Sequence, residues 1–260
     1  MHILRTRFKR DIVCEFLPPA RTSKKVLILC YGMPGVQKDK ATMEFWSKKG
    51  FWVFFPRYRG TWESGGEFLK NSPEQDILDV IGEIPKGFTD LWSGKNYRLP
   101  STGCELSVLG ASFGGTAAVL ASRDRRVRKA VALSPVIDWR VETPDEPMDK
   151  LAEYIPRAFG GCYRFSKKNW GRLSRGEFFN PADETATIDG KKLLIVHAKD
   201  DLVATYPPAR MFARRTGAEL MTFTRNGGPL RLRSGEASHF GLAKSTEPHI
   251  YKHIKKFFSS

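Results

Sequence analysis

Residues 110–114 read Gly-Ala-Ser-Phe-Gly, and this stretch is the most informative in the chain. It places Ser112 between two glycines, after an apolar run at residues 106–109 and before an alanine-rich run at residues 115–122. The first run predicts a strand and the second predicts a helix. A serine at such a sharp turn has a strained backbone and needs neighbours that are nearly free of side chain. The pattern predicts a nucleophile elbow, although a simple turn at the start of a helix could have the same sequence.

Apolar runs like the one before Ser112 recur along the chain, and each predicts a strand buried on both faces of a parallel sheet. They lie at residues 26–29, 51–55, 131–133 and 193–196, with a weaker run at 219–223. Two short segments near the start, residues 3–8 and 12–16, could form an opening antiparallel pair.

Helical patterns alternate with these strands. Ser72 precedes a proline and, three residues on, Gln75, so a capping box predicts a helix start there. A second helix is predicted to begin near residues 246–248 and to end the chain. This alternation predicts an α/β fold with a mostly parallel central sheet flanked by helices. A length of 260 residues fits a single domain spanning 1–260.

The interval 138–190 interrupts the alternation, because it contains many aromatic residues and no clear strand. We expect a helical lid or cap insertion over the carboxyl edge of the sheet. Packed helices without any role at a substrate pocket explain the same pattern equally well.

A serine nucleophile needs an imidazole that takes its proton and a carboxylate that orients the imidazole. His239 is the candidate base, since it alone among the five histidines lies between the last predicted strand and the last helix. Asp200 and Asp201 follow the run at 193–196 and are the candidate acids. We prefer Asp200, because Asp-x-x-Val with Val203 fits the common motif, but the sequence does not separate the two neighbours.

An oxyanion hole needs two backbone N–H groups near the nucleophile. Phe113 would supply one, and the loop after the run at 26–29 would supply the other. Pro34 in that loop has no N–H, which leaves Met33 as the candidate donor. An ordinary Gly/Pro turn is the alternative interpretation of the loop.

We expect no metal and no organic cofactor. His249 and His253 lie four residues apart on the last helix, and His197 lies close to the two aspartates, but neither group offers a complete ligand set. The cysteines show no C-x-x-C spacing and are predicted to be reduced core residues. They are Cys14, Cys30, Cys104 and Cys162.

The chain is strongly basic, with 43 Lys and Arg against 28 Asp and Glu and a net charge of +15. The basic residues are spread along the chain and no nucleic-acid-binding motif accompanies them, so nucleic acid is an unlikely partner. No apolar stretch is long enough to span a membrane, and we expect no signal peptide at the charged start. We therefore expect a cytoplasmic protein of undetermined oligomeric state.

Taken together, these motifs resemble those of the α/β-hydrolase superfamily, and most closely the catalytic domain of the prolyl oligopeptidase (S9) family. The resemblance covers most of the chain. It includes the elbow, the loop with Asp200 and the segment Ser-His-Phe-Gly at 238–241, together with residues 56–60, 64–66 and 134–139. Members usually carry a propeller before this domain, and only about 25 residues precede the first buried strand here, so we expect none. The loop around Met33 is closer to the loops of small esterases.

The resemblance implies a serine hydrolase that acts on a small-molecule ester or a short peptide. Hydrolysis of a carboxylic ester through an acyl-enzyme is the leading prediction, with a peptidase or acyl-peptide hydrolase second and an acyltransferase third. The alternative from another class is a non-catalytic binding protein with a basic surface. Substrate identity depends on the pocket formed by residues 138–190 and 224–237, which the sequence does not define.

Overall fold

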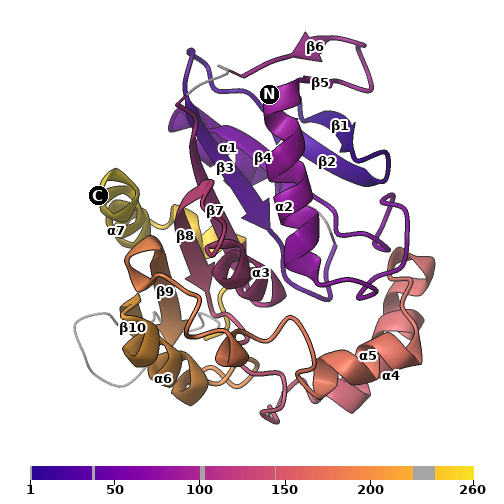
Figure 1. The fold of residues 1–260 in the computed structure, drawn as a ribbon, viewed down its shortest axis with the longest axis vertical. Helices are drawn as coiled ribbons and strands as arrows, with labels where there is room; N and C mark the ends of the chain where they lie inside the picture. Colours follow the sequence, from indigo (N-terminus) through magenta and orange to yellow (C-terminus); the bar gives the residue numbers. More distant parts are fainter. Residues whose placement is uncertain (1, 37–38, 100–102, 144, 225–237) are drawn as a thin grey trace.

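An eight-stranded sheet forms the centre of the computed structural model, which describes all residues except 1, 37–38, 100–102, 144 and 225–237 (Figure 1). The strand order is β1-β2-β4-β3-β7-β8-β9-β10. The strands are β1 (Leu4–Phe8), β2 (Ile12–Leu17), β3 (Lys25–Cys30), β4 (Trp52–Pro56), β7 (Glu105–Ala111), β8 (Val127–Leu133), β9 (Leu193–Ala198) and β10 (Glu219–Phe223).

The six strands from β4 to β10 in this order run parallel, and β1 and β2 form an antiparallel extension at one edge. Both the predicted parallel strands and the predicted opening pair are therefore confirmed. A separate ribbon of β5 (Phe88–Thr89) and β6 (Asn96–Tyr97), which the sequence did not predict, packs beside β1.

Helices cover both faces of the sheet. In Figure 1, α2 (Pro73–Glu83) and α3 (Phe113–Ala121) lie in front of the sheet and α1 (Lys40–Lys48) lies behind it. The remaining helices are α4 (Met148–Phe159), α5 (Lys167–Ser174), α6 (Tyr206–Thr216) and α7 (Pro248–Ser259), with short 3-10 turns at Ile84–Lys86, Gly160–Cys162, Pro181–Asp183, Gly190–Lys192 and Leu242–Thr246.

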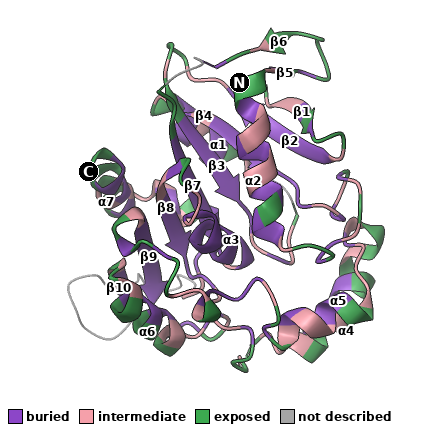
Figure 2. Ribbon diagram, viewed as in Figure 1, coloured by how far each residue is buried: buried purple, intermediate pink, exposed green. Residues whose placement is uncertain are grey.

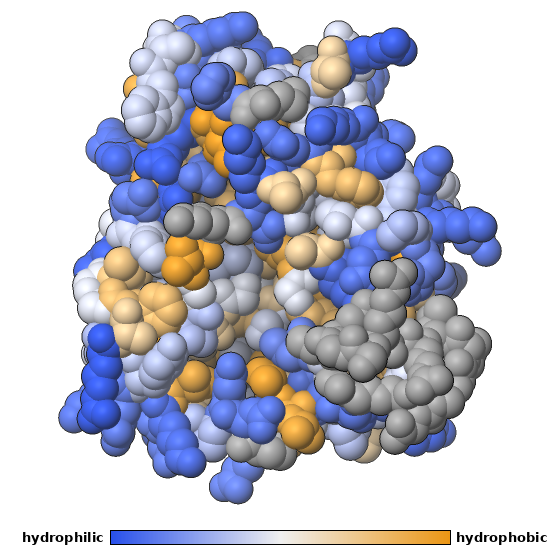
Figure 3. Space-filling model, turned by 180° about the vertical axis from the view of Figure 1, so that it is seen from behind, coloured by the Kyte–Doolittle hydropathy of each residue, from blue (hydrophilic) through white to orange (hydrophobic). Residues whose placement is uncertain are grey.

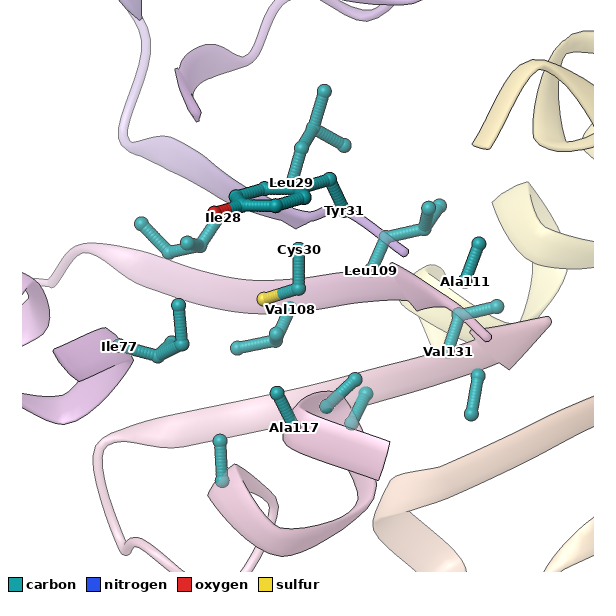
Figure 4. Packing of buried hydrophobic residues seen from close by; sticks show 14 of the residues in the cluster. Ile28, Leu29, Cys30, Tyr31, Ile77, Val108, Leu109, Ala111, Ala117 and Val131 are labelled. Atoms are coloured by element: carbon teal, nitrogen blue, oxygen red, sulfur yellow. The ribbon is translucent and has the colours of Figure 1, made fainter. Parts of the chain in front are cut away.

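The core lies between the sheet and these helices (Figure 2). Successive side chains of a strand point to opposite faces, so Leu29 and Leu109 face one side while Cys30 and Val108 face the side of α2 and α3 (Figure 4). All four are fully buried. Because helices cover both faces of the sheet, side chains on both faces of a central strand are buried. This explains why the strands appear in the sequence as continuous apolar runs.

Two expectations are corrected in detail. Ser72 does precede α2, but its hydroxyl contacts the Glu74 carboxylate instead of a backbone N–H, so the capping box does not form. Cys14 and Cys30 are buried, as predicted, whereas Cys104 is exposed and Cys162 is partly exposed. All four cysteines are free thiols.

Viewed from behind, the surface is mostly hydrophilic, with small separate apolar patches (Figure 3). No helix in the described part of the chain is long and apolar enough to cross a membrane.

Candidate active site

Ser112 lies between the end of β7 and the start of α3, at the carboxyl edge of the sheet. Its backbone has φ 54° and ψ −123°, a conformation that costs a non-glycine residue on the order of 1–3 kcal/mol. A Cβ on Gly110 would overlap the carbonyl of Gly114, and a Cβ on Gly114 would overlap the carbonyl of Cys30. The two glycines thus permit the close approach of β3, β7 and α3 that holds this turn.

Replacing Gly114 by alanine should destabilise the fold by about 3 kcal/mol or more, because the added methyl group meets backbone that cannot move aside. The free energy of unfolding from urea titration measures this loss. Gly161→Ala is the matched control, since a Cβ there has nothing within 4 Å. Equal stability of the two variants would contradict the described packing at the elbow.

His239 is paired with a buried carboxylate. Its Nδ1 lies 3.0 Å from Oδ2 and 3.2 Å from Oδ1 of Asp201. Burial is the largest single influence and would raise the pKa of Asp201, but the hydrogen bond and charge of His239 and the hydrogen bonds from Ala204 and Ser134 together lower the pKa below its usual value. The carboxylate is therefore ionised where an imidazole titrates, and it can both orient the ring and stabilise an imidazolium.

The preference for Asp200 as the partner of His239 is corrected by this geometry. The Asp200 carboxylate instead accepts a hydrogen bond of 2.9 Å from the hydroxyl of Ser238. Asp201 is held toward the imidazole because its Oδ1 accepts the backbone N–H groups of Val203 and Ala204, both at 2.9 Å. These two bonds fix the turn that follows β9. The carboxylate of the neighbouring residue, Asp200, points toward Ser238.

Ser134 is a site residue for which the sequence gave us no role. It is fully buried after β8, its hydroxyl accepts the N–H of Phe240 at 3.1 Å, and it hydrogen-bonds the Asp201 side chain. The Ser134 hydroxyl thus links the loop that carries His239 to the carboxylate of Asp201. The sequence signal was its position directly after the apolar run 131–133, and the structure adds a strained backbone with φ 42°.

Two cavities meet at Ser112. The larger, of about 610 Å³, lies against the segment that follows β8, and the smaller, of about 260 Å³, contains His239. Among the described residues, three line both cavities: Met33, Ser112 and Glu146. Glu146 was not singled out from the sequence. Burial raises its pKa, and the nearby His239 partly opposes that effect.

The candidate oxyanion donors lie beside Ser112 at these cavities. Met33 lines both cavities and Phe113 lines the larger one. Phe113 is the first residue of α3, where backbone N–H groups have no acceptor within the helix. Tyr163 holds the loop that contains Met33, because its hydroxyl accepts the N–H of Gly35 at 3.1 Å.

The interval 138–190 contains α4, α5 and short turns and, apart from an isolated bridge at Tyr163, no strand among its described residues. Its side chains form most of the lining of the larger cavity, including Trp139, Met148, Leu151 and Trp170. Trp139 also packs against Phe113, with ring centroids 5.8 Å apart. Residues 225–237, which we also expected near the pocket, lie outside the described residues.

The other histidines have separate environments. His197 is buried in β9, and its Nδ1 lies 2.8 Å from the carbonyl of Ala198. His253 lies 2.6 Å from Glu219, and the ring of His249 packs on Phe223. Within the described ranges, no three His, Cys, Asp or Glu side chains gather as a metal site would require.

A serine on a strained elbow, above a mostly parallel sheet flanked by helices, defines a serine hydrolase of the α/β-hydrolase fold. The chain belongs to the prolyl oligopeptidase family, whose model matches residues 37–260. A search of curated protein sequences finds no match.

Solved structures with the same fold include esterases and a peptidase. An esterase of Pyrococcus furiosus, Pf2001, has a TM-score of 0.66 at 17% identity, over 99% of this chain and 90% of that one. Est1E of Butyrivibrio proteoclasticus, solved with ferulic acid, has a TM-score of 0.65 at 18% identity, over 99% and 100%. The acylaminoacyl peptidase of Pyrococcus horikoshii has a TM-score of 0.59 at 16% identity, over 99% of this chain and 40% of that one.

Proposed function

We propose that this serine hydrolase cleaves carboxylic esters through an acyl-enzyme, with Ser112 as nucleophile, His239 as base and Asp201 as the acid that orients it. The observation that carries the proposal is the bond between His239 and Asp201 beside the cavity that Ser112 also lines. Asp201 replaces Asp200 in the role expected from the sequence.

The reaction has two halves. Oγ of Ser112 attacks the ester carbonyl while its proton passes to Nε2 of His239, whose Nδ1–H donates to Asp201. The tetrahedral oxyanion accepts hydrogen bonds from the N–H groups of Met33 and Phe113. Its collapse breaks the bond to the alcohol, which leaves with the proton from His239. A water molecule then gives one of its own protons to Nε2 of His239 and attacks the acyl carbon. Collapse of this second tetrahedral intermediate breaks the bond to Oγ of Ser112, which takes the proton from His239, and the acid is released.

The larger cavity supports an ester as the substrate. A volume of about 610 Å³ lies within the roughly 300–1,000 Å³ of small-molecule sites. Its apolar walls include Trp139 and Trp170, which suit an organic acyl group or alcohol. The segment 138–190 acts in this proposal as the lid that shapes the pocket.

The charge of the cavity differs from that of the whole chain. Glu142, Glu146 and Asp149 line it, and Arg140, one of the two cations among its described lining residues, is held by Asp138 and Asp183. The net charge of +15 therefore gives no reason to expect an anionic acyl group at this site. Neutral esters should have higher kcat/KM values than matched carboxylate-bearing esters.

A peptidase or acyl-peptide hydrolase is the second candidate. The family match favours it, and so do the acidic side chains of the cavity, which could hold a substrate amine. An acyltransferase would use the same acyl-enzyme with another acceptor. A non-catalytic binding protein is not retained, because the family and fold are those of serine hydrolases.

The experiment is a comparison of p-nitrophenyl esters of increasing acyl length with aminoacyl p-nitroanilides, at matched protein concentration. We expect turnover of esters with a preferred acyl length and much slower turnover of anilides. Faster cleavage of anilides than of every ester would overturn the ester proposal and favour the peptidase.

A further inference from the structure

The turn that follows β8 is hydrogen-bonded to the segments that carry the proposed catalytic residues. The backbone carbonyl of Leu133, the last residue of β8, accepts the N–H of Ser112 at 2.9 Å. The next residue, Ser134, donates its own N–H to the carbonyl of Val196 at 2.8 Å, in the strand β9 that leads to the acid. The nucleophile and β9 are thus tied to two neighbouring residues of one turn.

The side chain of Ser134 makes the connection to the base. Its hydroxyl oxygen accepts the N–H of Phe240, the residue after His239, at 3.1 Å. A hydroxyl has two lone pairs that accept and one proton that it donates, so this bond leaves the proton available. Ser134 donates that proton to the carboxylate of Asp201. One hydroxyl is therefore bonded both to the acid and to the loop that carries the base.

The hydrogen bonds that hold Asp201 act at two levels. Its Oδ1 accepts the N–H groups of Val203 and Ala204, which lie in the same turn as the aspartate. These two bonds fix the carboxylate only within its own loop. The bond from Ser134 fixes it relative to β8, and therefore relative to Ser112, which the preceding residue of β8 holds.

The position of Ser134 excludes a direct contact with substrate and favours a use for its hydroxyl. The residue is fully buried and is absent from the described lining of both cavities at Ser112. Its backbone has φ 42°, on the positive side where residues other than glycine are strained. Glycine would form this turn with less strain. The shape of the turn alone therefore does not account for a serine.

We propose that Ser134 is a positioning residue that holds the pair of Asp201 and His239 in line with the nucleophile. The inference rests on the proposed catalytic set and adds a fourth side chain to it. A misplacement of about 1 Å among reacting groups costs on the order of 100-fold in rate. Loss of the hydroxyl should therefore lower kcat for a p-nitrophenyl ester by about 10- to 100-fold. KM should stay nearly unchanged, because Ser134 is not among the described residues that line the cavities.

Two variants without the hydroxyl, Ser134→Ala and Ser134→Gly, separate positioning from folding. Alanine keeps the strained φ and glycine relieves it, so the glycine variant should unfold at the higher temperature. If Ser134 acts through its hydroxyl, both variants lose kcat although their melting temperatures differ. Ser122→Ala is the matched control and should keep the wild-type kcat. Ser122 is 1% exposed, and its hydroxyl donates to the carbonyl of Val119 at 2.6 Å near the end of α3.

A second measurement does not depend on turnover. In protein with ¹⁵N-labelled histidine, the proton on Nδ1 of His239 that donates to Asp201 gives an NMR signal, which is assigned by its loss in Asp201→Asn. We expect Ser134→Ala and Ser134→Gly to shift this signal or to broaden it through exchange with water. Ser122→Ala should leave the signal as it is in the wild type.

A lower kcat at unchanged KM in both Ser134 variants, together with an altered Nδ1 proton, supports the inference. It is overturned if either variant of an active enzyme keeps the wild-type kcat, if the loss falls on KM, or if the Nδ1 signal is unchanged. A wild type that turns over no ester, but whose Nδ1 proton still depends on Ser134, would contradict the ester proposal and support the positioning role. The two failures are therefore distinguishable.

Discussion

Replacing Ser112 by alanine should lower kcat for a p-nitrophenyl ester by about 10⁶-fold, as loss of the nucleophile does in other serine hydrolases. The alanine lacks the oxygen that forms the acyl-enzyme, while the cavities and the pair of His239 with Asp201 stay intact. Steady-state kinetics measures the loss, and a fluorophosphonate probe should label the wild type and not the variant.

Ser174→Ala is the matched control for this experiment. Ser174 lines the same larger cavity, and its hydroxyl donates to the carbonyl of Gly171 at 3.0 Å. This variant should keep both labelling and turnover. Equal labelling of wild type and Ser112→Ala would remove Ser112 from the role of nucleophile.

The second large effect concerns the two neighbouring carboxylates. Asp201→Asn should reduce kcat by about 10⁴-fold, because an amide that donates to Nδ1 leaves the imidazole in the wrong tautomer to accept the serine proton. The replacement removes a charge whose lowered pKa keeps it ionised across the pH range in which an imidazole titrates. Kinetics at several pH values measures the loss.

Asp200→Asn is the control for this prediction, since it makes the same chemical change one residue away. Asp200 contacts Ser238 and not the imidazole, so the variant should keep most of the wild-type activity. Loss of activity in Asp200→Asn but not in Asp201→Asn would restore Asp200, the acid preferred from the sequence. Melting temperatures of both proteins separate loss of catalysis from loss of folding.

The fold was largely predictable from the sequence because its signals are local. Apolar runs such as 193–196 are long enough to mark buried strands, and the glycines around Ser112 mark a turn that side chains would block. Helix α6 was not predicted, although Pro207 and Pro208 suit its first turn and Gly217 its end. The ribbon of β5 and β6 was missed because strands of two residues have no measurable periodicity.

The site was predictable in part. The sequence indicated Ser112, His239 and an acid after β9, because the ends of parallel strands meet at one edge of the sheet. It could not choose between Asp200 and Asp201, because the direction of a side chain in a turn depends on contacts with distant residues. Here those contacts include His239, 38 residues away in the chain.

The sequence by itself determined the alternation of strands and helices and the elbow at Ser112, since hydrophobic periodicity and the steric demand for glycine act over a few residues. Only the tertiary structure decided which carboxylate meets the imidazole, that Ser134 joins their loops, and that Glu146 stands where two cavities meet. Each of these depends on segments far apart in the chain that packing brings into contact, and no local pattern records such contacts.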